Sequence, residues 1–235
     1  MTRRRWIADE VSGNRAALTG DHARHLAQVL RAAVGQEFDI SSGAEVRHGK
    51  VISVHLERVE FELGEIIGQS DHAQITVAMS VFKYDRMEWA IEKCTELGVA
   101  RIVPVIAERT EKHLASAAAK RAERWRRIVQ EAAEQSRRVS SPEVVEAIKF
   151  KELFAVTAET RIVLSEVEQD VMLKDAVPEA ANSVLLAFGP EGGWTEKELE
   201  SFRKAGWASA SLGPTILRAE TAIIAAVAIA LSAIN

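Results

Sequence analysis

Residues 183–195 read SVLLAFGPEGGWT, and this stretch decides the fold of the larger part of the chain. Residues 183–188 form an apolar run with the length of a buried strand, and the glycines that follow predict a tight loop. Thr195 and Glu198 have the Thr-x-x-Glu spacing of a capping box, so a helix is expected to begin after Thr195. A buried strand, a glycine loop and a helix in direct succession are typical of an α/β domain with a parallel sheet.

The same alternation continues on both sides of this stretch. Further apolar strands are expected at residues 75–81, 101–106, 161–165 and 208–212. Helices are expected at residues 85–97, 116–138, 196–205 and 220–234. Because helices join consecutive parallel strands, we expect residues 71–235 to form an α/β domain with helices on both faces of one sheet.

The first part of the chain has a different pattern. Short alternating strands are expected at residues 37–40, 51–56 and 59–63, with glycines in the turns between them. Such a pattern predicts a small barrel or sandwich. One helix is expected at residues 22–31, with Asp21 as its N-cap. The polar segment 68–71 separates the two patterns, so we place a small β domain at residues 1–70.

Composition limits the classes of function. Of the 235 residues, 47% are apolar and 27% are charged, which is the balance of a globular protein. The single cysteine, Cys94, excludes a disulfide within the chain and a cysteine-based zinc site, and the six histidines lack metal-ligand spacing, so no metal site is expected. The longest apolar run, 222–234, is shorter than the roughly 20 residues of a membrane span. We therefore expect a cytoplasmic protein with a buried C-terminal helix and no membrane partner.

Positive charge is concentrated in two segments of an acidic chain. The net charge is −4, yet residues 101–140 hold ten Lys/Arg against five Asp/Glu, and residues 1–31 hold six arginines against three acids. Two basic segments predict a local surface for a polyanion such as RNA. Exposed helix faces with internal ion pairs are the alternative interpretation.

Two loops carry the pattern of a ligand site. The glycine loop 189–193 follows a buried strand, at the end where parallel sheets bind ligands, although it lacks the GxGxxG and P-loop motifs and could be a structural turn. The second loop, 212–218, reads LGPTILR and holds apolar residues where a loop is usually polar. It predicts either an apolar slot for a flat ligand or a loop tucked under the last helix. Arg218 is expected to point into a site or an interface.

Together these segments resemble the RsmE family, the bacterial small-subunit ribosomal RNA methyltransferases that make 3-methyluridine. The resemblance is carried, in chain order, by residues 25–31 (HLAQVLR), 85–89 (DRMEW), 93–99 (KCTELGV), 108–110 (ERT), 131–136 (EAAEQS), 189–193 (GPEGG) and 212–222 (LGPTILRAETA). It implies a SPOUT-type domain with a parallel sheet and a deep trefoil knot at residues 71–235. It also implies a PUA-like RNA-binding barrel at residues 1–70 and a homodimer with the site near the interface.

The resemblance further implies S-adenosylmethionine as the cofactor, held by three loops. The expected cofactor-binding residues are Leu164, Ser165, Glu166, Phe188, Gly189, Glu191, Gly192, Gly193, Leu212, Gly213, Ile216, Leu217 and Arg218. The expected RNA-binding residues are Arg4, Arg5, Arg24, Arg31, Arg109 and Arg138. The RNA partner would be small-subunit ribosomal RNA, either naked or in the assembled 30S subunit.

The implied chemistry is attack of uridine N3 on the sulfonium methyl group. Arg218 is the expected catalytic residue, because a cation would stabilise charge on the uracil carbonyl oxygens. Glu191, Glu220 and a water remain alternatives for the general base. Methylation of a ribose 2′-hydroxyl and a non-catalytic role in RNA binding and subunit assembly are the competing functional hypotheses.

Overall fold

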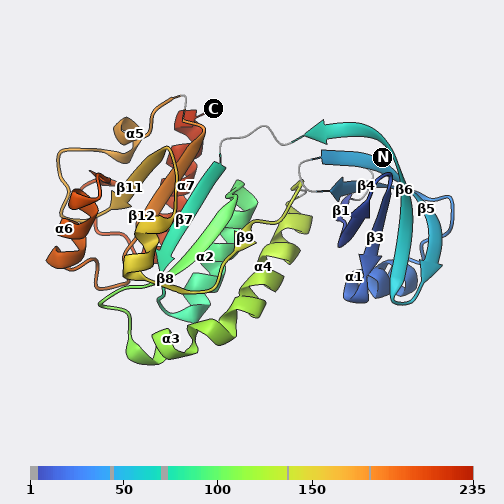
Figure 1. Ribbon diagram of the computed structural model, residues 1–235, viewed down its shortest axis with the longest axis horizontal. Helices are drawn as coiled ribbons and strands as arrows, with labels where there is room; N and C mark the ends of the chain where they lie inside the picture. Colours follow the sequence, from blue (N-terminus) through green and yellow to red (C-terminus); the bar gives the residue numbers. More distant parts are fainter. Residues whose placement is uncertain (1–4, 43–44, 70–73, 137, 180, 235) are drawn as a thin grey trace. The chain divides into compact units, whose positions relative to one another are not determined.

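The computed structural model describes the whole chain except residues 1–4, 43–44, 70–73, 137, 180 and 235 (Figure 1). The chain divides into two compact units. The first comprises residues 1–71 together with 133–141, and the second comprises residues 72–132 and 142–235. The sequence places a boundary after residue 70, but it carries no signal that the segment 133–141 groups with the first unit.

The first unit is built on a six-stranded sheet. Its strands are β1 (Arg5–Ile7), β2 (Glu10–Ser12), β3 (Arg15–Thr19), β4 (Glu37–Ser42), β5 (Glu45–His55) and β6 (Arg58–Gln69), in the order β1-β4-β5-β6-β3-β2. Strand β1 is parallel to β4, and the other neighbours are antiparallel.

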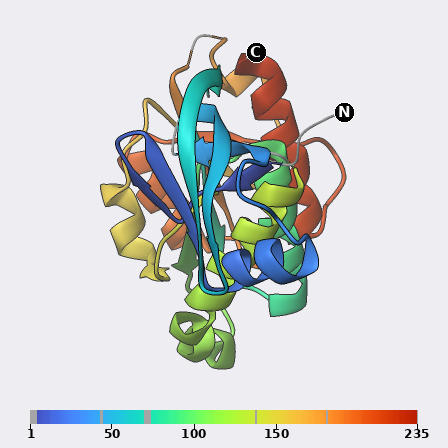
Figure 2. The same cartoon turned by 90° about the vertical axis from the view of Figure 1, so that its right-hand side faces the viewer.

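This sheet curls on itself (Figure 2). Its two edge strands, β1 and β2, are separated only by Ala8 and Asp9. Ala8 N donates to Ser41 O of β4 at 2.9 Å, and Asp9 N donates to Ala17 O of β3 at 3.0 Å. Because the short segment between the two edge strands bonds to both of their neighbours, β4 and β3, it brings the two edges of the sheet toward each other and the sheet curls.

The helical segment of the first unit differs from the prediction. An α-helix, α1 (Gly20–Arg24), continues as a π-helical turn (His25–Val29), and the residue before the helix is Thr19. Asp21 therefore lies in the first turn and is not the N-cap. Leu26 is buried in the core of this unit, so the wider π turn still directs an apolar side chain inward. Arg31 follows with φ +51°, in the left-handed region.

The second unit contains a parallel sheet of seven strands, which confirms the predicted α/β class. The strands are β7 (Gln74–Ser80), β8 (Arg101–Ile106), β9 (Glu143–Val144), β10 (Ile148–Lys149), β11 (Thr160–Leu164), β12 (Ser183–Phe188) and β13 (Ala208–Ala210). The order is β10-β8-β7-β12-β11-β13, and β9 also pairs with β8. The strand predicted at residues 208–212 ends at Ala210.

Helices cover both faces of this sheet (Figure 1). They are α2 (Tyr84–Leu97), α3 (Lys112–Ala117), α4 (Ala122–Gln135), α5 (Leu173–Ala176), α6 (Glu196–Lys204) and α7 (Ala219–Ile234), with 3₁₀ turns at Ala118–Arg121 and Phe150–Ala155. Apolar residues of α2, α4, α5 and α7 share one core cluster, and those of α6 and the second 3₁₀ turn share another. The strands supply both clusters because their side chains alternate between faces: Ile75 and Val77 face the first, and Ala78 faces the second. Of the helices in the described part of the chain, none is long and apolar enough to cross a membrane.

The single helix predicted at residues 116–138 is wrong. The structure has α3, a 3₁₀ turn and α4 in this region. The Tyr84 hydroxyl donates to Leu114 O at 2.6 Å and so competes for a carbonyl that a continuous α-helix would use for the Ala118 N–H. A side chain from α2 therefore favours a break for which the local sequence has no glycine or proline signal.

Candidate functional site

A cavity of about 380 Å³ lies where strands β11, β12 and β13 end and helix α7 begins. This is the end of a parallel sheet at which α/β proteins bind ligands. Three loops and the first turn of α7 form most of its wall. The lining residues are Arg86, Leu164, Ser165, Glu166, Phe188, Gly189, Pro190, Glu191, Gly193, Ala210, Ser211, Leu212, Gly213, Pro214, Thr215, Ile216, Leu217, Arg218, Ala219 and Ala222.

The glycine loop needs glycine at two positions. Gly193 has φ +67°, and a Cβ there would lie 2.2 Å from Glu166 Oε1. A Cβ on Gly189 would lie 3.1 Å from the carbonyl carbon of Gly193 and 3.2 Å from Trp194 N. The loop is thus folded tightly on itself and against the Glu166 side chain, which itself lines the cavity.

Helix α6 holds the end of this loop through the predicted capping box. Thr195 Oγ1 accepts from Glu198 N at 3.3 Å, and Glu198 Oε2 accepts from Thr195 N at 2.9 Å, so the capping box is confirmed. Glu198 is buried, and its other oxygen accepts from Glu108 N at 2.8 Å. The indole Trp194 Nε1 donates to Leu164 O at 3.2 Å and ties this loop to the end of β11.

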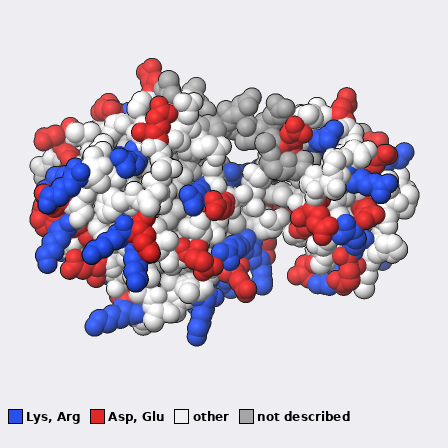
Figure 3. All heavy atoms as spheres, in the orientation of Figure 1, with Lys and Arg blue, Asp and Glu red and all other residues white. Residues whose placement is uncertain are grey.

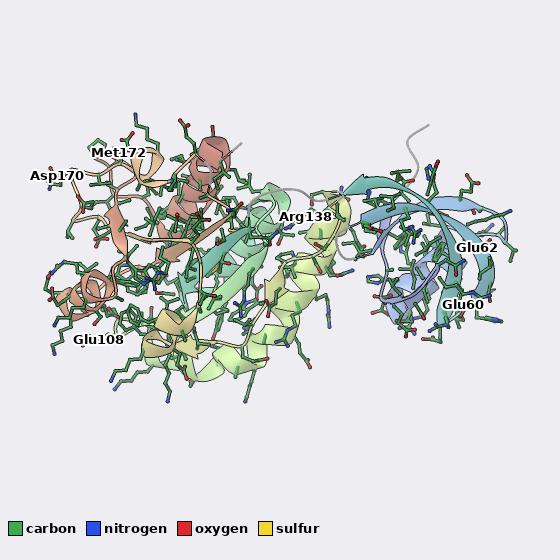
Figure 4. The ribbon with its side chains drawn as sticks, turned by 45° about the horizontal axis from the view of Figure 1, so that its top comes forward. Glu60, Glu62, Glu108, Arg138, Asp170 and Met172 are labelled. Carbon is green, nitrogen blue, oxygen red and sulfur yellow. The ribbon has the colours of Figure 1, made fainter. Side chains whose placement is uncertain are left out.

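The segment 108–110 braces the glycine loop from the end of strand β8. Arg109 Nη1 donates to the carbonyls of Gly192 and Trp194, the latter at 3.3 Å, and Thr195 Oγ1 donates to Glu108 Oε2 at 3.0 Å. Glu108, in the segment that follows β8, is labelled in Figure 4. Arg109 thus braces the glycine loop through Nη1. Its expected contact with RNA stays a prediction.

The loops after β11 and β13 are also pinned to each other. Met172 forms an isolated parallel bridge with Ser211, and Leu173 N donates to Ser211 O at 2.9 Å. The Glu168 carboxylate accepts from Asp170 N at 3.0 Å, and backbone hydrogen bonds, that from Asp170 foremost, lower the pKa of Glu168. Asp170 and Met172 lie in the same loop (Figure 4). The cavity wall therefore consists of loops fixed by their mutual contacts.

Charges of both signs line the cavity. Arg86 and Arg218 are its cations, and Glu166 and Glu191 are its anions. Glu191 Oε1 accepts from Lys83 N at 3.3 Å. Arg218 is exposed, whereas Glu220, in the first turn of α7, is buried and lies 3.8 Å (Oε1) from Arg86 Nε. Of the two carboxylates considered for the general base, only Glu191 lines the cavity.

The structure brings the predicted cofactor-binding residues together. All thirteen except Gly192 line the cavity, and a Cβ on Gly192 would instead lie 3.3 Å from Arg109 Cδ. Pro190, Pro214 and Thr215 also line the cavity and lie within the expected loops 188–193 and 212–218. Sequence reasoning missed Arg86, Ala210, Ser211, Ala219 and Ala222. Arg86 had a signal, because it lies in the DRMEW segment that carries the family resemblance.

The arginines expected to bind RNA have varied surroundings. Arg4 lies outside the described residues, and Arg5 is half-buried on β1. Arg24 forms ion pairs with Asp21 and Glu57, while Arg31 is exposed. Arg138, labelled in Figure 4, is half-buried, and burial lowers its pKa.

The arginines of the basic segment 101–140 are largely ion-paired. Arg121 and Arg124 both contact Glu88 Oε1, at 3.2 and 2.7 Å, and Arg126 contacts Glu146 Oε1 at 2.7 Å. Figure 3 shows acidic and basic side chains interspersed over the visible surface. These pairs support the salt-paired alternative for this part of the segment, although they join α4 and the preceding 3₁₀ turn to other elements and do not lie within one helix.

Comparison with known proteins identifies the family. Residues 69–231 match the model of the RNA methyltransferase domain family. The chain is 33% identical to ribosomal RNA small subunit methyltransferase E of Bacillus subtilis, over 88% of this chain and 85% of that one. It is 30% identical to the protein of the same name from Aquifex aeolicus, over 95% and 97% of the two chains.

A solved structure agrees with these relatives. The ribosomal RNA small subunit methyltransferase E of Neisseria gonorrhoeae, bound to S-adenosyl methionine, is 31% identical. Its TM-score is 0.82, and the match covers 97% of this chain and 96% of that one. With the parallel sheet and its loop-lined cavity, these matches show that the chain belongs to the RNA methyltransferase domain family, in the group of ribosomal RNA small subunit methyltransferases E.

Proposed function

We propose that the protein transfers a methyl group from S-adenosylmethionine to N3 of a uridine in small-subunit ribosomal RNA. The observation that carries the proposal is the cavity at the ends of β11, β12 and β13, lined by the loops that the resemblance assigns to the cofactor. Relatives named ribosomal RNA small subunit methyltransferase E, which match 88% and 95% of this chain, support methylation of small-subunit ribosomal RNA.

The residues around the cavity fit this cofactor. Leu164, Phe188 and Ala210 give it apolar walls for an adenine ring. Glu166 and Glu191 supply negative charge for a molecule with a sulfonium and an ammonium group. When bound, the cofactor supplies an electrophilic methyl group to the reaction.

The side chains of this chain orient the uridine and favour its anion. Arg218 is exposed at the cavity, immediately before α7, and can donate to a carbonyl oxygen of the uracil. A cation at that oxygen stabilises the negative charge that uracil gains when N3 loses its proton. Of Glu191 and Glu220, the two carboxylates considered for the general base, Glu191 lines the same cavity and can accept that proton.

The finer fold and assembly features belong to the same proposal. The curled sheet of the first unit would be PUA-like and bind RNA, and the second unit would be a SPOUT domain with a trefoil knot. A homodimer would cover the exposed apolar side chains Trp89 of α2 and Ile216 of the cavity loop, which are 47% and 86% exposed. A ribosomal RNA substrate would place the enzyme in the cytoplasm.

The test is a methylation assay with two substrates. Naked small-subunit RNA and assembled 30S subunits are incubated with the protein and labelled S-adenosylmethionine, and the RNA is digested to nucleosides for mass spectrometry. Labelled 3-methyluridine supports the proposal. Ribose-methylated nucleosides, or cofactor binding without any labelled product from either substrate, would overturn it.

Arg218→Ala tests the role given to this residue. Because its contact strengthens as charge develops on the uracil, the change should lower the single-turnover rate far more than cofactor affinity. Calorimetry with S-adenosylmethionine measures the second quantity. A variant with full activity would remove the assignment.

A further inference from the structure

Arg86 belongs to a different secondary-structure element from the other residues of the cavity wall. Of the described residues that line the cavity, it alone comes from outside strands β11, β12 and β13, the loops that follow them and the first turn of α7. It lies in the first turn of α2, and its side chain is 34% exposed. It therefore stands beside the three loops assigned to the cofactor, at a side of the cavity that they do not form.

The guanidinium of Arg86 has hydrogen-bond donors that no described residue uses. Its Nε lies 3.8 Å from Glu220 Oε1, and no described residue accepts a hydrogen bond from its terminal nitrogens. Those two nitrogens carry four of the five donors of a guanidinium. A half-exposed cation on a cavity wall with unused donors is arranged to bind an oxygen acceptor from outside the protein.

Glu220 forms an ion pair with this arginine. The carboxylate is buried, 7% exposed, and does not line the cavity. Its Oε2 is buried and has no hydrogen-bond partner in the described part of the chain. Burying a carboxylate is costly unless a cation compensates its charge, and among the described residues Glu220 pairs with Arg86. The negative charge of Glu220 also offsets that of Arg86, which reduces the repulsion between Arg86 and a sulfonium in the cavity.

The chemistry of uracil accounts for two cations in one cavity. When N3 loses its proton to water or to Glu191, the electron pair left on N3 is delocalised onto both flanking carbonyl oxygens. The N3 pair then forms the bond to the methyl carbon, and the pair of the breaking carbon–sulfur bond remains on sulfur. One arginine can serve only one side of the ring, so each carbonyl oxygen needs its own donor.

We infer that Arg86, positioned by Glu220, donates to the uracil carbonyl oxygen that Arg218 does not reach, and that the two arginines together increase the acidity of N3–H. This inference rests on the proposed function. The other charged groups that line the cavity are Glu166 and Glu191.

The test is the pH dependence of single-turnover methylation. Arg86→Gln should react on the order of tenfold more slowly at pH 7, as expected when one charged hydrogen bond to an anion is lost. Its rate should approach that of the unmodified protein at higher pH, where N3–H ionises without help. Arg86→Lys should recover part of the loss, and Glu220→Gln should move the profile in the same direction by a smaller amount.

Two controls separate this role from others. Lys93→Gln removes a positive charge from the same helix at a residue paired with Glu92 and Glu96, and it should leave the profile unchanged. Calorimetry should show that Arg86→Gln binds S-adenosylmethionine with unchanged affinity.

An unshifted pH profile for Arg86→Gln would overturn the inference. So would a loss of cofactor affinity with an unshifted profile, which would assign Arg86 to the cofactor carboxylate. If the unmodified protein makes no 3-methyluridine, the proposed function itself fails, and that result is distinct from either outcome.

Discussion

Gly193→Ala perturbs the cavity at its tightest point. The residue has φ +67°, and left-handed backbone costs a non-glycine residue about 1–2 kcal/mol. The new Cβ would also lie 2.2 Å from Glu166 Oε1, so the carboxylate must move away from its position in the cavity wall. The Glu166 side chain is flexible, and a non-ideal rotamer costs about 0.5–1.5 kcal/mol.

Gly206→Ala is the matched control. Gly206 has a similar φ of +73°, but a Cβ there meets nothing within 4 Å, and the residue lies beyond α6 and outside the cavity wall. Both variants should therefore lose about 1–2 kcal/mol of stability from backbone strain, or roughly 2–8 °C in Tm for a chain of this size. Only Gly193→Ala carries the additional clash with Glu166.

Calorimetry with S-adenosylmethionine then separates an effect on cofactor binding from the loss of stability that both variants share. A displaced Glu166 should weaken binding about tenfold, which corresponds to about 1.4 kcal/mol. Gly206→Ala should bind as the unmodified protein does. If Gly193→Ala also bound the cofactor normally, the assignment of this cavity as the cofactor site would be refuted.

Three further predictions concern stability, RNA binding and pH. Glu198→Ala should lower the free energy of unfolding by about 1–3 kcal/mol, because its buried carboxylate accepts hydrogen bonds from the backbone N–H groups of two segments. Thermal denaturation measures the loss, with a substitution of an exposed neighbour, Glu196→Ala, as the control. Equal Tm values for the two variants would contradict the prediction. Arg31→Gly should keep the stability of the unsubstituted protein within about 1 kcal/mol, since a φ of +51° suits glycine. The same change should weaken RNA binding and lower the slope of log affinity against log salt concentration by about 1 in a filter-binding series. An unchanged slope would exclude Arg31 from the RNA surface. The hydrogen bond to Asp9 outweighs burial and raises the pKa of His22 above 6.5, so its stabilisation is complete below about pH 6.5 and is lost as pH rises through the higher folded pKa. Urea denaturation should therefore show the difference between the unmodified protein and His22→Gln shrinking from pH 6 to pH 8, and a constant difference would contradict this.

The sequence predicts the sheet of the second unit well, because a strand buried on both faces leaves an apolar run that few other structures share. Residues 183–188 form β12 over that span, and the glycine loop follows as expected. The cavity follows from the same logic, since loops after neighbouring parallel strands meet at one edge. The strand order that makes β11, β12 and β13 neighbours comes only from the structure.

Other features depend on contacts that leave no local pattern. Two adjacent glycines look alike in the sequence, yet only Gly193 has a left-handed backbone and faces Glu166. The break between α3 and α4 follows a hydrogen bond from Tyr84 of α2. Arg109 belongs to a basic segment, but its partners are carbonyls far along the chain. The local charge pattern therefore does not reveal that Arg109 braces the site.

The bracing contacts explain how such a cavity can be well defined although loops form most of its wall. Glu198 links the start of α6 to the segment after β8, Arg109 holds the glycine loop by its carbonyls, and Trp194 ties that loop to β11. Each contact joins segments that are distant in sequence, so ordering one loop limits the freedom of the next. Catalysis by positioning requires this kind of rigidity, because a group displaced by about 1 Å can cost on the order of 100-fold in rate. The brace residues should therefore influence methyl transfer from outside the cavity, whereas the role we propose for Arg218 and Arg86 is to stabilise charge on the substrate.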